Sequence, residues 1–172
     1  VCSSDLGGIT KKTYNARNQV TLISYPDGTE ERFIYHIEGT LAHHIDKQGE
    51  KTTYSYDFLG RETSSINPLG YATYFFYSPF HLIKTVNPAG EETVYTYDKA
   101  GRKIGKIADQ EHIEYEYDSL GRLYLVRIGE KEELKTYDPL GNIVQESTQN
   151  IQGRLLKQTN YTYDSSGNIE SI

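Results

Sequence analysis

Short stretches of the chain alternate between apolar and polar residues. Residues 113–117 read Ile-Glu-Tyr-Glu-Tyr, and residues 73–77, 93–97 and 159–163 share that phase. Successive side chains of a strand point to opposite faces, so the alternation predicts β-strands. Only residues 155–158 (Leu-Leu-Lys-Gln) are ambiguous between helix and strand.

The alternating stretches belong to a repeat of 20 or 21 residues. The dipeptide Tyr-Asp occurs five times, and Tyr77 keeps the register between the first two copies. Tyr14 and Tyr35 extend the same register toward the N-terminus. A repeat of this length indicates an array of similar structural units. We interpret residues 7–172 as about eight units, with a six-residue insertion within 143–160.

Each unit carries two turn signals. The first, Asp-x-x-Gly, follows the tyrosine, as at residues 98–101. The Asp carboxylate accepts hydrogen bonds from backbone amides ahead of it, and Gly adopts positive φ without a Cβ clash, so the pair predicts a hairpin turn with a bulge. The second signal lies about ten residues later and reads Asn-Pro-x-Gly at 67–70 and 87–90, with looser versions at 26–28, 47–49 and 129–130.

Together these signals predict an all-β fold, in which consecutive antiparallel β-hairpins of about 20 residues form a curved single-layer sheet. A hydrophobic content of 36% is too low for a thick core in a chain of 172 residues. A twisted sheet of this many strands is expected to curl. The 16 tyrosines suit a single layer, because each ring packs across strands while its hydroxyl reaches a polar partner.

The motif Tyr-x-Tyr-Asp-x-x-Gly-Arg, followed by an aliphatic residue, resembles the repeat of the Rhs/YD-repeat family. It is intact at residues 54–61, 95–104 and 115–123, and residues 161–168 carry Asn in place of Arg. The family includes bacterial Rhs toxins, the cocoon components of insecticidal toxin complexes, and teneurins. The resemblance implies a β-strip that winds into a hollow shell, which in the bacterial toxins contains a C-terminal toxic domain. The residues that match the repeat motif are Tyr54, Tyr56, Asp57, Gly60, Arg61, Tyr95, Tyr97, Asp98, Gly101, Arg102, Tyr115, Tyr117, Asp118, Gly121, Arg122, Tyr137, Asp138, Gly141, Tyr161, Tyr163, Asp164 and Gly167.

Two places depart from the motif. Residues 77–81 read Tyr-Ser-Pro-Phe-His, so both Asp and Gly are missing from that turn, and Pro79 predicts a different turn type. In the unit of Tyr137, Lys135 occupies the position that Tyr115 has one unit earlier. We expect both places to interrupt a ladder of stacked tyrosine rings.

Candidate chemistry in the sequence is sparse. His36, His43 and His44 do not predict a metal site. The strand period places His36 and His44 in different strands, the adjacent His43 and His44 point to opposite faces, and no Cys lies near them. The Asp138-Pro139 turn resembles the turn at the end of Rhs shells, where paired aspartates are associated with self-cleavage. We interpret it as an ordinary turn, because it lies in the repeat register and no second Asp-Pro follows. The Asp and Arg that flank a turn are interpreted as braces of that turn rather than as a ligand clamp.

The resemblance, together with the sparse candidate chemistry, implies a non-enzymatic shell segment that encapsulates or presents a C-terminal toxin or effector domain. The expected partners are the rest of the same shell and that attached domain, and no cofactor or metal is expected. The net charge of −6 argues against nucleic-acid binding, and no apolar run is long enough to span a membrane. The alternative is an adhesion module in which Tyr115 and Tyr117 contact carbohydrate or a cell-surface protein.

Two further expectations concern the ends and the location of the protein. Residues 1–6 fit nothing in the repeat and are interpreted as a non-native N-terminal scar. No signal peptide is visible in the sequence. By resemblance, the parent protein is expected to be secreted or displayed on the cell surface.

Overall fold

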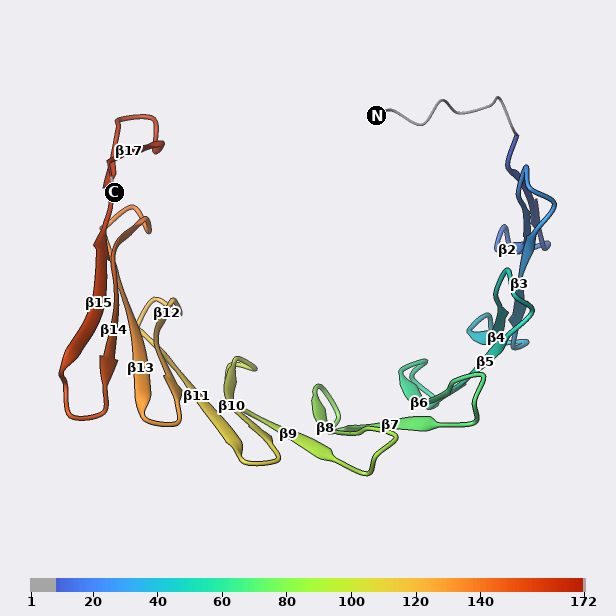
Figure 1. The fold of residues 1–172 in the computed structure, drawn as a ribbon, viewed down its shortest axis with the longest axis horizontal. Helices are drawn as coiled ribbons and strands as arrows, with labels where there is room; N and C mark the ends of the chain where they lie inside the picture. The colour runs from blue at the N-terminus through green and yellow to red at the C-terminus, as the bar shows by residue number, and fades with distance from the viewer. Residues whose placement is uncertain (1–8, 172) are drawn as a thin grey trace. The chain divides into compact units, whose positions relative to one another are not determined.

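The computed structural model describes residues 9–171 and is all-β, as the sequence predicts (Figure 1). Its main element is a 15-stranded sheet in which strand order follows chain order from β1 to β15, and a separate pair is formed by β16 and β17. Where strand partners are assigned, each pair is antiparallel. No helix is present within this described range.

The strand bounds follow the alternating stretches. The strands are β1 (Lys11–Tyr14), β2 (Val20–Ser24), β3 (Glu30–Tyr35), β4 (Leu41–Ile45), β5 (Lys51–Tyr56), β6 (Glu62–Ile66), β7 (Ala72–Tyr77), β8 (Leu82–Val86), β9 (Glu92–Tyr97), β10 (Lys103–Ala108), β11 (Glu111–Tyr117), β12 (Leu123–Ile128), β13 (Lys131–Tyr137), β14 (Ile143–Asn150), β15 (Leu155–Asn160), β16 (Thr162–Tyr163) and β17 (Ile169–Ser171). Residues 155–158, which were ambiguous from sequence, are therefore part of a strand.

The turns that follow the repeat tyrosines have the predicted geometry. Gly60, Gly101 and Gly121 have φ of 77°, 81° and 84°, a left-handed conformation that suits glycine. The pairing register shifts next to each of these turns, for example between Glu116 and Tyr117. This shift is the expected β-bulge, and it sets the side-chain direction of the tyrosine that precedes the turn.

The turns at the opposite ends of the hairpins also use positive φ. Gly70 and Gly90, from the two Asn-Pro-x-Gly signals, have φ of 83° and 84°. The turn between β10 and β11 contains Asp109 at φ 51°, and its short turn signal was not recognised in the sequence. Aspartate tolerates this conformation better than most residues do, because its side chain bonds locally to the backbone.

The chain divides into two compact units, which are treated separately. One contains residues 9–76 with Thr85–Gly90, and the other contains Tyr77–Lys84 with residues 91–171. Among the described hydrophobic residues only Ala42 and Leu125 are buried, one in each unit. The units therefore lack a layered hydrophobic core, and contacts between neighbouring strands and turns must hold them together.

Three sequence interpretations can be placed on this fold. The insertion predicted within 143–160 coincides with the long hairpin of β14 and β15. His36 was assigned to a strand, and this is wrong, because it lies in the turn that follows β3. Residues 1–6, interpreted as a scar, lie outside the described residues.

Candidate functional site

The feature that recurs along the chain is a joint between consecutive hairpins. Each joint combines the turn after one repeat tyrosine, the residue that follows this turn, and the tyrosine and turn of the next repeat. We call the space between two such turns the slot. The joints lie at one edge of the sheet, because the repeat tyrosine ends every odd-numbered strand from β1 to β13.

The turn itself is braced by its aspartate. Backbone amides of Ala100 and Arg102 both donate to Oδ1 of Asp98 at 2.9 Å, and Nε of Arg102 donates to Oδ2 at 2.7 Å. The Asp57–Arg61 and Asp118–Arg122 pairs repeat this arrangement. The predicted role of these pairs as turn braces fits these contacts.

The brace shifts the titration of the aspartates. The backbone amide of Arg102, followed by its guanidinium, lowers the pKa of Asp98 below the ordinary value. The amide and guanidinium of Arg122 lower the pKa of Asp118 in the same way. Both groups stabilise the ionised carboxylate, so neither aspartate is suited to act as a proton donor near neutral pH.

The repeat tyrosine joins its hairpin to the preceding one. The β10–β11 ladder pairs Gly105–Ala108 with Glu111–Glu114 and extends no further toward this edge. Beyond it, the hydroxyl of Tyr117 donates to the carbonyl oxygen of Lys103 at 2.9 Å. The same bond occurs from Tyr35 to Val20, from Tyr97 to Leu82, from Tyr137 to Leu123 and from Tyr163 to Ile143. The tyrosine thus replaces ladder bonds where neighbouring hairpins separate.

Arginine fills the slot in two joints of the second unit. The Arg102 guanidinium carbon lies 4.8 Å from the centre of the Tyr117 ring, and that of Arg122 lies 4.5 Å from the centre of the Tyr137 ring. Nη1 of Arg122 also donates to the carbonyl oxygen of Asp138 at 3.2 Å. A single arginine therefore braces its own turn and contacts the next one, through a cation–π contact or a hydrogen bond.

His81 fills the slot at the turn that lacks Asp and Gly. Its ring stacks on Tyr97 with 4.4 Å between centroids and 19° between planes. It immediately precedes Leu82, the carbonyl partner of Tyr97, as Arg102 precedes Lys103. The turn is one residue shorter and is closed by a bond from the Ser78 amide to the His81 carbonyl. Histidine thus supplies a ring contact at this joint although its turn lacks Asp and Gly, and the predicted break in a tyrosine ladder stays a prediction.

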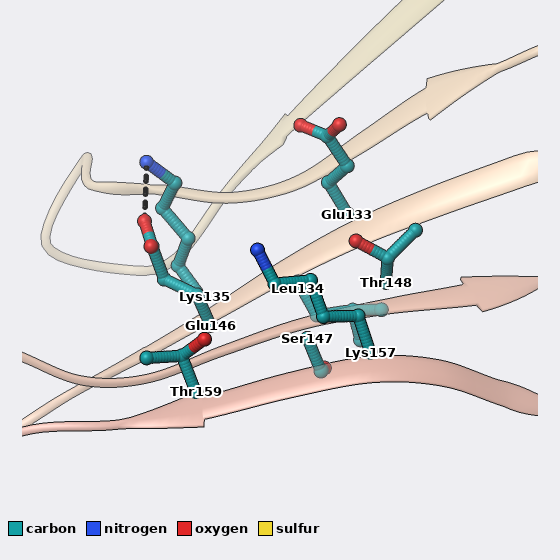
Figure 2. A pocket seen from close by; sticks show the side chains of 8 residues that line it. All are labelled: Glu133, Leu134, Lys135, Glu146, Ser147, Thr148, Lys157 and Thr159. Atoms are coloured by element: carbon teal, nitrogen blue, oxygen red, sulfur yellow. Dashed lines mark ion pairs between the residues drawn. The ribbon is translucent and has the colours of Figure 1, made fainter. Parts of the chain in front are cut away.

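Lys135 lies at the edge of a cavity on the sheet surface. A cavity of about 210 Å³ lies over β13, β14 and β15 (Figure 2). Its Lys135 and Glu146 form an ion pair at 3.1 Å, so a charged cross-strand pair stands where Tyr115 stands one unit earlier. Glu133 and Lys157 also line the cavity, which gives it balanced charge and no nucleophile paired with a base.

The tyrosines proposed to contact carbohydrate differ in their surroundings. The Tyr117 ring is covered by Arg102, and its hydroxyl is engaged by Lys103. The hydroxyl of Tyr115 makes no hydrogen bond within the described part of the chain. Sugar contact by Tyr115 and Tyr117 stays a prediction.

The remaining candidate residues, His43, His44 and Asp138, each contact different neighbours. His43 bonds to Thr53, whereas His44 stacks on Phe33. No group of three potential metal ligands occurs among residues 9–171. The Asn142 side-chain amide donates to Oδ2 of Asp138 at 2.9 Å and lowers its pKa. Asp138 is thus braced like the other turn aspartates, with Asn142 in place of arginine.

One charged network was missed by sequence reasoning. Arg127 of β12 bonds to Glu114 and Glu116 of β11 and to Glu132 of β13. The Tyr124 hydroxyl and then Arg127 lower the pKa of Glu116, while the Gln149 amide and then Arg127 lower that of Glu132. The alternation of β11 shows that its glutamates share a face, but their partner depends on the pairing register between β11 and β12.

Comparisons with known proteins agree with this architecture. Residues 4–172 match the family model described as Teneurin YD-shell. A search of curated proteins finds no match. Among solved structures, the TcdB2-TccC3-Cdc42 crystal structure is 20% identical with a TM-score of 0.76, and the alignment covers 91% of this chain. The structure of TcdB2-TccC3 without its hypervariable C-terminal region is 19% identical with a TM-score of 0.77, and the alignment covers 92% of this chain. The structure of a mutant Tc holotoxin pore of Photorhabdus luminescens is 19% identical with a TM-score of 0.75, and the alignment covers 90% of this chain. The chain spans 10% of the length of each of these structures.

Proposed function

Because the chain belongs to the Teneurin YD-shell family, we propose that it is a wall segment of a YD-repeat shell and that this shell encloses an attached toxin or effector domain. The proposed partners are the remaining shell and that domain. The proposed location of the whole protein is outside the producing cell or on its surface. The role is structural rather than catalytic.

The observation that carries this proposal is the repeated joint. In the joint of Arg102, a hydroxyl-to-carbonyl bond and a contact from the slot residue extend the sheet by one hairpin. Stability of this kind grows by nearest-neighbour contacts, so a wall can be lengthened without a central core. The scarcity of buried side chains among the described residues fits that mode of construction.

The turn carboxylates and arginines support a structural role. Asp98 and Arg102 bond to each other and to their own turn, so they have little remaining capacity to bind or activate a substrate. The similarity to TcdB2-TccC3 structures supports the fold of the proposed wall segment.

Protease protection tests the proposal in the longer polypeptide that it requires. We expect the attached domain to resist proteinase K while the shell is folded and to be digested once urea unfolds the shell. The same domain expressed alone is the control and should be digested without urea. Equal digestion of the attached domain before and after unfolding of the shell would contradict containment.

A further inference from the structure

The joint between the turns at residues 36–39 and 57–60 is built differently from the others described above. Thr40 follows its turn glycine and occupies the position of Arg102 and Arg122. A threonine side chain is too short to cross the slot. At Gly121, Nη1 of Arg102 lies 3.3 Å from the site of a Cβ, whereas at Gly60 the nearest atom, Cγ2 of Thr40, lies 4.0 Å away.

The short side chain leaves a groove. A cavity of about 610 Å³ is lined by residues of both turns, including His36, Glu38, Thr40, Tyr56 and Asp57. His36 meets Tyr56 edge-on, with 6.3 Å between the ring centroids, so it borders the groove without stacking on the ring. In the preceding joint, Gln19 is longer than Thr40 and reaches the Gly39 carbonyl at 2.7 Å.

Two polar groups that line the groove, on Tyr56 and Glu38, have no partner within the described residues. The hydroxyl of Tyr56 makes no hydrogen bond within residues 9–171, although Tyr35, Tyr97 and Tyr117 all bond to the preceding hairpin. In the same range the carboxylate of Glu38 pairs with no cation. The groove therefore offers an aromatic ring, a free hydroxyl and an unpaired carboxylate at one place.

The filled slots indicate which chemical group fits this set. In the joint of Arg122, the guanidinium lies over the Tyr137 ring and donates to the carbonyl oxygen of Asp138. Tyr56 and Asp57 stand at the same positions of the 57–60 turn, and both line the groove. Glu38 can supply the anionic partner that Asp118 supplies to Arg122. We propose that this groove binds the guanidinium group of an arginine side chain presented by another polypeptide segment.

The surroundings also suit the rest of an arginine side chain. Phe58 and Leu59 line the groove and are 93% and 57% exposed, so they can pack against the aliphatic stem. The net charge of −6 favours the approach of a cation. Lysine fits less well, because its point charge does not reproduce planar stacking with simultaneous hydrogen bonding.

An NMR titration of the full chain with acetyl-arginine methylamide tests this proposal. We expect saturable shifts centred on Thr40, Tyr56 and Gly60. Acetyl-citrulline methylamide has nearly the same shape without the charge, and it should bind about tenfold more weakly because charge-assisted hydrogen bonds and the cation–π contact are lost. Equal affinity for the two probes, or shifts that do not saturate at these residues, would overturn the proposal.

Two substitutions and one control variant test the location of the site. Thr40→Arg should fill the slot from within the chain and weaken probe binding at least about tenfold, since one guanidinium then competes with another. Thr29→Arg adds the same charge after a turn glycine at the opposite sheet edge and should leave binding unchanged. Glu38→Gln, which is exposed and removes no contact of the fold, should weaken binding even if Thr40→Arg fails to fold. Unchanged binding in Glu38→Gln would overturn the assignment of the anionic partner and with it the proposed site.

Discussion

Joints in the two units have similar turns but differ in the side chain that lies in the slot. The first unit has the joint at Thr40, and the second has the joints at Arg102 and Arg122. In the second unit a guanidinium crosses the slot and the next tyrosine bonds to the preceding hairpin. At Thr40 both contacts are absent within the described residues, and a groove remains. The comparison indicates that the turn and strand pairing define the repeat, whereas the slot residue determines how tightly neighbouring hairpins are joined.

The joint at His81 adds a third variant. Its aromatic ring stacks on Tyr97, where the joints of Arg102 and Arg122 place a guanidinium over a tyrosine ring. An imidazole and a guanidinium can therefore both fill the slot, because each presents a planar face to the tyrosine ring. These three joints therefore share a planar side chain at one position rather than a fixed residue type.

The largest effect is expected where backbone strain and crowding coincide. Gly101→Val places a β-branched residue at φ 81° and brings its Cβ within 3.1 Å of the His81 ring. We expect a loss of at least about 1–3 kcal/mol in the free energy of unfolding, measured by urea denaturation. Gly141→Val has φ of 95° and no atom within 4 Å of its Cβ, so it should lose less. An unchanged urea midpoint for Gly101→Val would contradict the turn geometry.

A smaller effect is expected at the aromatic joint. His81→Ala removes a ring stack and should lower the free energy of unfolding by about 0.5–1.5 kcal/mol in urea denaturation. His112→Ala is the control, since His112 is exposed and makes only a long ion pair with Glu114. Equal losses in the two variants would show that the stack contributes nothing specific.

The sequence predicted local features well and contacts between hairpins poorly. Asp98 and Gly101 specify their turn through atoms only a few residues apart, so the sequence was sufficient there. The acceptor of the Tyr117 hydroxyl is a backbone carbonyl on the neighbouring hairpin, and no residue type marks it. His81 was missed because alignment from Tyr77 hides the one-residue deletion. If the repeats are aligned on Leu82 and Lys103 instead, His81 occupies the position of Arg102.

The smallest effect is a change in acid stability. Asp98 and Asp118 have folded-state pKa values below the ordinary 3.8, so in acid the unfolded chain binds more protons than the folded chain. The stability they contribute is present above pH 3.8 and is lost as pH falls through the folded pKa. Urea midpoints measured across this range should therefore vary less with pH in the Asp98→Asn, Asp118→Asn variant. Asp109→Asn is the control outside the joints, and an identical pH profile for all three proteins would argue against the brace.

The central claim is that tyrosine hydroxyls join consecutive hairpins, and one matched comparison tests it most directly. The urea midpoint of a variant with Tyr97, Tyr117 and Tyr137 changed to Phe is compared with that of a variant carrying Phe at Tyr54, Tyr95 and Tyr115. Only the first set loses hydrogen bonds to neighbouring hairpins, each contributing about 0.5–1.5 kcal/mol. The account predicts a clearly lower midpoint for the first variant and a nearly unchanged midpoint for the second. Equal midpoints would contradict it.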